Sequence, residues 1–206
     1  MRFDDLFDDL EGQLEQELHA EELDLHAEEE RLRLGRTSLR ERILAIQSSE
    51  ARHSLYSIRT RLVDDSVEDL RPATVGRDWF SAELVSSTGR SATAGRSRQC
   101  IIPLSAVAAL MLTRSQVSRS VVPRPQSEAE RGLSARLTLG FVLRDLCRRR
   151  ADVELRLRTG TERGTIDRVG RDHLDLAVHE AGSPRRESVV SGYRVIPFTE
   201  VISVRL

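Results

Sequence analysis

The 206-residue chain has no lysine, few aromatic residues (4%), only two cysteines and no long apolar run. No apolar run approaches the ~18–20 residues that a membrane span needs. The first residues also lack the basic-then-apolar order of a signal peptide. We therefore expect a soluble, cytoplasmic protein without membrane association, with cores built from Leu, Val, Ile and Ala.

The sequence also lacks the common signatures of catalysis and metal binding. It contains no phosphate-binding glycine-rich loop, no H-E-x-x-H motif and no nucleophile-elbow serine. Cys100 and Cys147 have no C-x-x-C partner, which favours two reduced, buried thiols, with a disulfide between the two halves as the alternative. We expect a protein that is not an enzyme and that uses no cofactor and no metal.

What the chain does contain is a repeat spaced 94 residues apart. Val-Gly-Arg-Asp-Trp at 75–79 recurs as Val-Gly-Arg-Asp-His at 169–173, and Ile-Pro-Leu-Ser-Ala-Val at 102–107 recurs as Ile-Pro-Phe-Thr-Glu-Val at 196–201. An ungapped alignment of 73–112 with 167–206 gives nine identities in 40 positions, where composition alone would give roughly two or three. The repeat predicts two similar halves.

Charge is distributed very unevenly along the chain. Residues 1–31 hold thirteen acids and two arginines, a net charge of −11, which leaves +10 for the remaining residues. All 32 Lys-or-Arg positions are arginine, for which a GC-rich genome is the favoured explanation. The functional alternative is a preference for bidentate phosphate or carboxylate contacts, which arginine makes and lysine does not. A charge difference of this kind between the first 31 residues and the rest is typical of a segment that interacts with a partner.

The acidic segment carries an apolar stripe. Its hydrophobic residues recur at intervals of three, four and seven, which predicts one long acidic amphipathic helix over 3–34, ending at Gly35. The stripe needs cover from the chain itself, a second copy or another protein. The candidate partner-binding residues are Phe3, Leu6, Phe7, Leu10, Leu14 and Leu18.

Each half is predicted to contain a leading helix, a strand, a long strand bent at glycine, a variable hairpin loop, a strand, a break at proline and a final strand. In the first half the strands are expected at 53–63, 74–85, 99–102 and 107–112. In the second half a helix is expected at 131–149 and strands at 153–157, 164–178, 193–196 and 201–206. Between the two halves, residues 114–130 contain two prolines and four serines, which predict an extended linker. The expected domains are the acidic helix (1–35), the first half (36–113), the linker (114–130) and the second half (131–206).

This order of elements resembles the Sm-like fold, the small five-stranded barrel of the Sm/LSm/Hfq superfamily, also seen at the C-terminus of the ribosome-maturation factor RimP. The residues that carry the resemblance are Gly164, Ile166, Val169, Gly170, Asp172, Leu174 and Leu176, followed by 195–204. The resemblance implies an α+β, mainly β protein of two tandem Sm-like barrels, each with a leading helix. The superfamily's base pocket is not implied, because its Asn and Arg-Gly are replaced here by residues such as Asp175 and Pro197-Phe198.

Two functions are compatible with these patterns. The first is a non-enzymatic, RNA- or other nucleic-acid-associated protein whose basic loops contact phosphate, with the acidic helix as competitor or partner-docking segment. Its candidate residues are Arg90, Arg96, Arg98, Arg185, Arg186 and Arg194, with Trp79 and His173 expected to point outward. The alternative is a protein-interaction or assembly module that uses the N-terminal leucine stripe and an exposed edge strand, 201–206 or 107–112, without nucleic acid. Homo-oligomerisation is compatible with either function.

Overall fold

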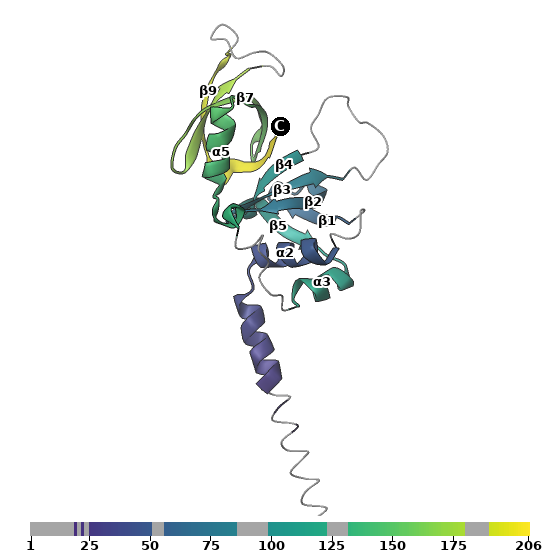
Figure 1. The fold of residues 1–206 in the computed structure, drawn as a ribbon. Helices are drawn as coiled ribbons and strands as arrows, with labels where there is room; N and C mark the ends of the chain where they lie inside the picture. Colours follow the sequence, from purple (N-terminus) through teal and green to yellow (C-terminus); the bar gives the residue numbers. More distant parts are fainter. Residues whose placement is uncertain are drawn as a thin grey trace, which may run out of the picture. The chain divides into compact units, whose positions relative to one another are not determined.

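The computed structural model describes residues 19, 22, 25–50, 56–85, 99–122, 132–179 and 190–206. The chain divides into two units, residues 1–38 and 39–206 (Figure 1). No helix in these described ranges is both long and apolar enough to cross a membrane.

In the first unit, residues 25–36 form a helix. Ion pairs between positions three apart line it, such as Arg31 with Glu28, whereas Leu25 and Leu32 are exposed. The helix that the structure describes thus spans 25–36, and the prediction of one long helix over 3–34 is wrong. An apolar stripe without cover contributes no packing energy, and packing provides most of the stability of helices in proteins. The six candidate partner-binding residues between Phe3 and Leu18 lie outside the described residues.

The second unit contains one antiparallel sheet of ten strands in the order β5-β1-β2-β3-β4-β10-β6-β7-β8-β9. The first five are β1 (Ile58–Leu62), β2 (Val67–Val75), β3 (Trp79–Leu84), β4 (Gln99–Pro103) and β5 (Val107–Met111). The others are β6 (Asp152–Leu157), β7 (Gly160–Val169), β8 (His173–Val178), β9 (Gly192–Pro197) and β10 (Val201–Arg205).

The prediction of two tandem Sm-like barrels is wrong, because the sheet is continuous and does not close. The reason is the position of β10, which pairs with β6 of its own half and with β4 of the other half. Within the described part of the chain, β5 and β9 are the two ends of the sheet. The expected edge at 107–112 is thus found in β5, whereas the expected edge at 201–206 is an interior strand.

The sequence repeat is also a repeat of strand order. The first half is arranged β5-β1-β2-β3-β4 and the second β10-β6-β7-β8-β9, so each strand of the second half corresponds to the strand numbered five lower. The register agrees with this correspondence: Phe80 lies opposite Ile102, and Leu174 lies opposite Ile196, each 94 residues later. Any residue of the repeated strands can therefore be compared with a counterpart in a different environment.

Helices accompany both halves. The α-helices are α2 (Leu39–Glu50), α3 (Arg114–Ser120) and α5 (Leu139–Arg148), and the 3₁₀ turns are η1 (Leu104–Ala106), η2 (Leu133–Arg136) and η4 (Phe198–Glu200). Helix α2 packs against β2 and α3, and α5 packs against β7. On α5, Leu139, Leu143 and Leu146 are buried at a spacing that places them on one face. The helix predicted at 131–149 is thus shorter, and its Phe141 is exposed.

Helix α3 occupies part of the segment that was predicted to be an extended linker. Thr113 starts it with a capping box: its hydroxyl accepts a hydrogen bond from the Gln116 N–H, and the Gln116 side chain accepts one from the Thr113 N–H. Such reciprocal caps satisfy backbone donors that a helix leaves free. The two prolines of the segment, at 123 and 125, follow the helix and do not interrupt it.

Candidate assembly interface

The two halves meet at the pairing of β4 with β10, which we call the inner joint. Val204 lies opposite Ile101, and Arg205 lies opposite Cys100. The two hydrophobic cores interlock here, because Ile202 of β10 belongs to the core of the first half and Ile101 of β4 to that of the second. The inner joint is therefore a packed core as well as a hydrogen-bonded ladder.

A glycine turn of the first half docks on the second half beside this joint. The Gly76 N–H donates to the Trp79 carbonyl at 2.8 Å, and the Trp79 ring lies over the glycine, where a Cβ would come within 2.3 Å of the indole nitrogen. The indole N–H donates to the Leu137 carbonyl at 3.0 Å. The Asp78 carboxylate accepts the Leu139 N–H at 2.7 Å. The turn therefore anchors the start of α5.

This turn corrects two expectations. The strands predicted at 74–85 and 164–178 as single bent strands are each two strands, separated at Gly76 and Gly170. Trp79, expected to point outward, is only 6% exposed and belongs to the core of the second half. Alternation along β3 placed it outward, but the segment that covers it comes 58 residues later in the chain.

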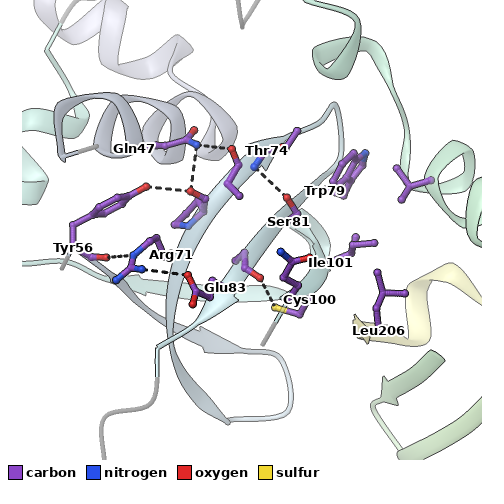
Figure 2. Close-up of a pocket in the computed structure, with 15 residues that line it drawn as sticks. Gln47, Tyr56, Arg71, Thr74, Trp79, Ser81, Glu83, Cys100, Ile101 and Leu206 are labelled. Carbon is purple, nitrogen blue, oxygen red and sulfur yellow. Dashed lines mark hydrogen bonds and ion pairs between the residues drawn. The ribbon is translucent and has the colours of Figure 1, made fainter. Parts of the chain in front are cut away.

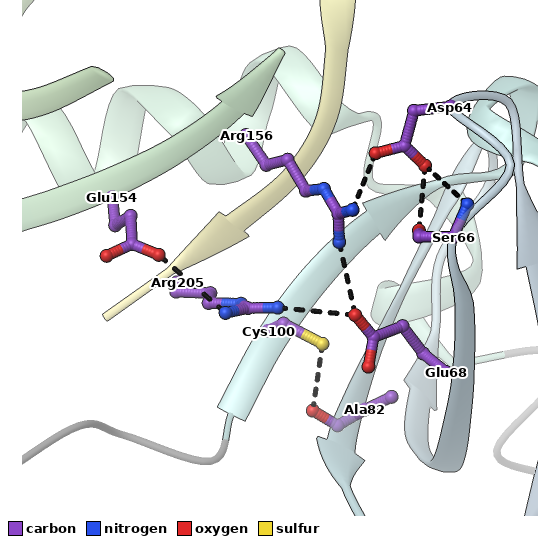
Figure 3. Close-up of polar contacts among 8 residues, drawn as sticks. All are labelled: Asp64, Ser66, Glu68, Ala82, Cys100, Glu154, Arg156 and Arg205. Carbon is purple, nitrogen blue, oxygen red and sulfur yellow. Dashed lines mark hydrogen bonds and ion pairs between the residues drawn. The ribbon is translucent and has the colours of Figure 1, made fainter. Parts of the chain in front are cut away.

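An ion-pair network bridges the two halves on one side of the inner joint (Figure 3). Arg156 of β6 contacts Asp64 at 2.7 Å and Glu68 of β2 at 3.1 Å. Glu68 also lies 3.6 Å from Arg205 of β10, which reaches Glu154 at 3.7 Å. Glu68 therefore lies between two guanidinium groups of the other half, and all these side chains are at most 27% exposed.

Asp64 is the acid of this network with a resolved pKa shift. Partial burial alone would raise its pKa, but hydrogen bonds from the hydroxyl and N–H of Ser66, together with the Arg156 charge, outweigh burial and leave the pKa below the ordinary 3.8. The carboxylate form is thus favoured in the folded protein. Asp64 is charged when it pairs with Arg156 at neutral pH.

The two free edges carry the counterparts of the inner-joint strands. β9 corresponds to β4, and β5 corresponds to β10. Val195 is 69% exposed where its counterpart Ile101 is 7% exposed, and Met111 and Tyr193 are 41% and 56% exposed. Both edges therefore present apolar side chains to solvent, and at Val195 the counterpart residue is buried at the inner joint.

The second glycine turn repeats the local geometry of the first, but in the described part of the second unit no segment bonds to the Asp172 and His173 side chains as residues 137–139 bond to Asp78 and Trp79. The Gly170 N–H donates to the His173 carbonyl at 2.9 Å. The His173 ring bonds the Asp172 carboxylate at 2.8 Å, which lowers the pKa of Asp172. The Asp172 side chain is 85% exposed. His173 itself is half-buried, so its predicted outward position holds only in part.

A cavity of about 610 Å³ is lined by residues of β2, β3 and β4 of the first half, with Val142 and Leu206 of the second half also lining it (Figure 2). Gln47 donates to the carbonyls of Pro72 and Ala73, and Tyr56 donates to the carbonyl of Pro72. These polar side chains already bond within the protein, so the cavity presents mainly apolar contacts to any molecule that enters it.

Cys100 lines the same cavity, and Cys147 lies on α5. Neither forms a disulfide in the structure; Cys100 is buried as expected, whereas Cys147 is only half-buried. Burial raises the pKa of the Cys100 thiol to about 11, and its Sγ donates to the Ala82 carbonyl. Cys100 is therefore a protonated core residue at neutral pH, not an activated nucleophile.

The predicted phosphate-contacting arginines are mostly outside the described residues: Arg90, Arg96, Arg98, Arg185 and Arg186. Arg194 is described, on β9, where it is exposed and lies 3.9 Å from Glu162. The structure does not bring Arg194, Trp79 and His173 together into a described basic surface. Sequence reasoning did not identify Glu68, which faces the inner joint, although the 94-residue repeat aligns it with Glu162 and so gave a signal for both positions.

Comparison with protein-family models, with curated proteins and with solved structures finds no match for this chain. The resemblance to the Sm/LSm/Hfq superfamily stays a prediction.

Proposed function

We propose that the chain is a protein-assembly module in which copies join head to tail through the free edges β5 and β9. The inner joint is the observation that supports this proposal. It is a pairing between a β4-type strand and a β10-type strand, and each copy carries one further strand of each type at its two ends. The partner that fits each free edge is therefore the opposite edge of another copy.

The register of the inner joint can be transferred to the outer edges. Because Val204 pairs with Ile101, their counterparts Leu110 and Val195 would lie opposite each other, and Met111 would lie opposite Arg194. The pairing would cover Val195 and Met111. Since it joins two different surfaces, each added copy leaves one edge of each type, and the assembly is a ring or a filament.

The composition of β5 supports the same proposal. Exposed edge strands are commonly protected from pairing by charged residues or proline. β5 reads Val-Ala-Ala-Leu-Met and has neither. Its residues are small or apolar, like the first four residues of β10, which pairs on both sides.

Blocking each edge separately tests the proposal. Val195→Lys blocks β9. Ala108→Lys blocks β5, because Ala108 is exposed whereas its counterpart Ile202 is buried at the inner joint. Val117→Lys on α3 is the matched control because Val117 is also an exposed apolar residue. In sedimentation equilibrium, wild type and V117K should form species larger than the 23.2 kDa chain. Each edge variant alone should stay monomeric, and an equimolar mixture of the two should stop at dimers. A monomeric wild type at all concentrations contradicts the proposal.

Nucleic-acid association is the second candidate, and the net charge of +10 outside residues 1–31 is the observation that favours it. Trp79 gives it no support, because a buried indole cannot stack on a base. Binding of the full chain to a short single-stranded RNA and to a DNA duplex, each across a salt series, tests it. Affinity that falls steeply with salt supports phosphate contacts, and no binding at low salt rejects them.

A further inference from the structure

The repeat pairs each member of the inner ion network with a counterpart near a free edge. Arg156 lies opposite Ser203 of β10, and Arg61 lies opposite Ala109 of β5, where Ala109 and Ser203 are 94 residues apart. Glu68 and Glu162 are also 94 residues apart, and they lie opposite the residues that precede Arg61 and Arg156, Thr60 and Leu155. Arg61 is thus the counterpart of Arg156, and Glu162 is the counterpart of Glu68.

The two counterparts lie in different surroundings from the inner pair. Arg156 and Glu68 are joined at 3.1 Å across the inner joint, each about one quarter exposed. Arg61 projects from the exposed side of β1. Glu162 is 33% exposed, and the Arg194 guanidinium lies 3.9 Å from its carboxylate.

We propose that Arg61 of one copy pairs with Glu162 of the next, as Arg156 pairs with Glu68, and that this pair determines the order and register of head-to-tail assembly. The inference rests on the proposed function. It identifies the partner surface of each edge by charge: β1 beside β5 supplies the cation, and β7, two strands in from β9, supplies the carboxylate.

The neighbouring charges define how closely the outer pair would copy the inner one. Glu68 contacts two guanidinium groups, those of Arg156 and Arg205. Glu162 would contact Arg194 of its own copy and Arg61 of the next, so the charge count is the same. Asp64 has no acidic counterpart, because the β6–β7 turn carries Arg158 and Thr159. Arg61 would therefore have Glu162 as its acidic partner at the joint between copies, whereas Arg156 has both Asp64 and Glu68.

Charge reversal at both positions tests the inference in the full chain. R61E places two acids at the joint and E162R places two cations there, so each variant alone should self-associate at least about tenfold more weakly than wild type. The double variant R61E/E162R should recover association. A mixture of the two single variants should recover it too, because each joint then joins opposite charges. Arg168→Glu, an exposed arginine further along β7, is the charge-matched control and should associate like wild type.

The outcomes separate the inference from the proposed function. If wild type associates and the single reversals associate equally well, the Arg61–Glu162 pair is wrong while edge assembly stands. If wild type stays at 23.2 kDa, edge assembly fails and the pair fails with it. Weakening in both single variants, with recovery in the mixture and in the double variant, establishes the pair. Unchanged midpoints of urea unfolding in dilute protein show that the variants are folded.

Discussion

Ile101 on β4 and Val195 on β9 occupy the same position in the two halves, yet one is 7% exposed and the other 69% exposed. Both are β-branched residues, and each belongs to the fourth strand of its half. The difference is the neighbour on the outer side: β10 lies there beside Ile101, and no described strand lies on the outer side of Val195. The same position is thus buried where another strand follows in the sheet and exposed where the described sheet ends.

The two glycine turns show the same difference. Trp79 is buried against Leu137, which belongs to the second half. No described segment occupies the equivalent place beside the second turn, so His173 is partly exposed and Asp172 largely exposed. In both halves the turn is hydrogen-bonded to the residue after the Ile-Pro pair of the repeated motif. The Leu104 N–H donates to the Asp78 carbonyl, and the Phe198 N–H donates to the Asp172 carbonyl. The local structure is repeated, and the contacts beyond it are not.

Truncating the paired positions should give the largest difference. Ile101→Ala removes buried methyl groups from the inner joint and should lower the free energy of unfolding by about 2–4 kcal/mol. Val195→Ala should change it by less than about 0.5 kcal/mol. Urea unfolding at a concentration where the chain is monomeric measures both. Equal losses would show that β9 is covered in the monomer.

A methyl group added at the two turn glycines should give the next largest difference. Gly76→Ala forces the buried Trp79 ring away from its bond to Leu137, with an expected cost of about 1–3 kcal/mol. Gly170→Ala meets the His173 ring, which is half-exposed and free to turn outward, so its cost should stay below about 1 kcal/mol. Thermal melting of the two variants compares them, and a larger loss for G170A would contradict this explanation.

Removing the paired arginines should produce a smaller contrast. Arg156→Met leaves Asp64 and Glu68 with one fewer partner, and we expect a loss of about 1–2 kcal/mol because the network is partly solvated. Arg61→Met should leave the stability of the monomer nearly unchanged. Chemical unfolding in low and high salt measures both variants, and salt should reduce the loss for R156M.

Acidification should give the smallest effect. The folded pKa of Asp64 lies below its unfolded value of 3.8, so its contribution to stability is present above pH 3.8 and is lost as pH falls through the folded pKa. Ser66→Ala removes the hydroxyl donor to Asp64 and should raise the pH at which this stability is lost. The free energy of unfolding should change by less than about 1 kcal/mol at any pH. Urea midpoints between pH 5 and 3 follow it, with Ser105→Ala, at an exposed serine, as the control.

The sequence predicted the repeat and most strands, because alternation and glycine turns are local properties. It could not predict which strand lies beside which: nothing local in Val201–Arg205 indicates pairing with β4. For the same reason Trp79 was expected outside, since its cover comes from 137–139. Of the predicted sites, the edge at 107–112 was found, whereas Glu162 and Arg61 gain meaning only from the three-dimensional register.

Directed cross-linking between chains tests the central claim most directly. Leu110 and Val195 would lie opposite each other at the outer joint, at a separation that a disulfide can span. Chains carrying Leu110→Cys and Val195→Cys should give a covalent dimer under mild oxidation only when mixed, with wild type as the control for Cys100 and Cys147. Covalent dimers from L110C alone, or none from the mixture, would contradict head-to-tail pairing of β5 with β9.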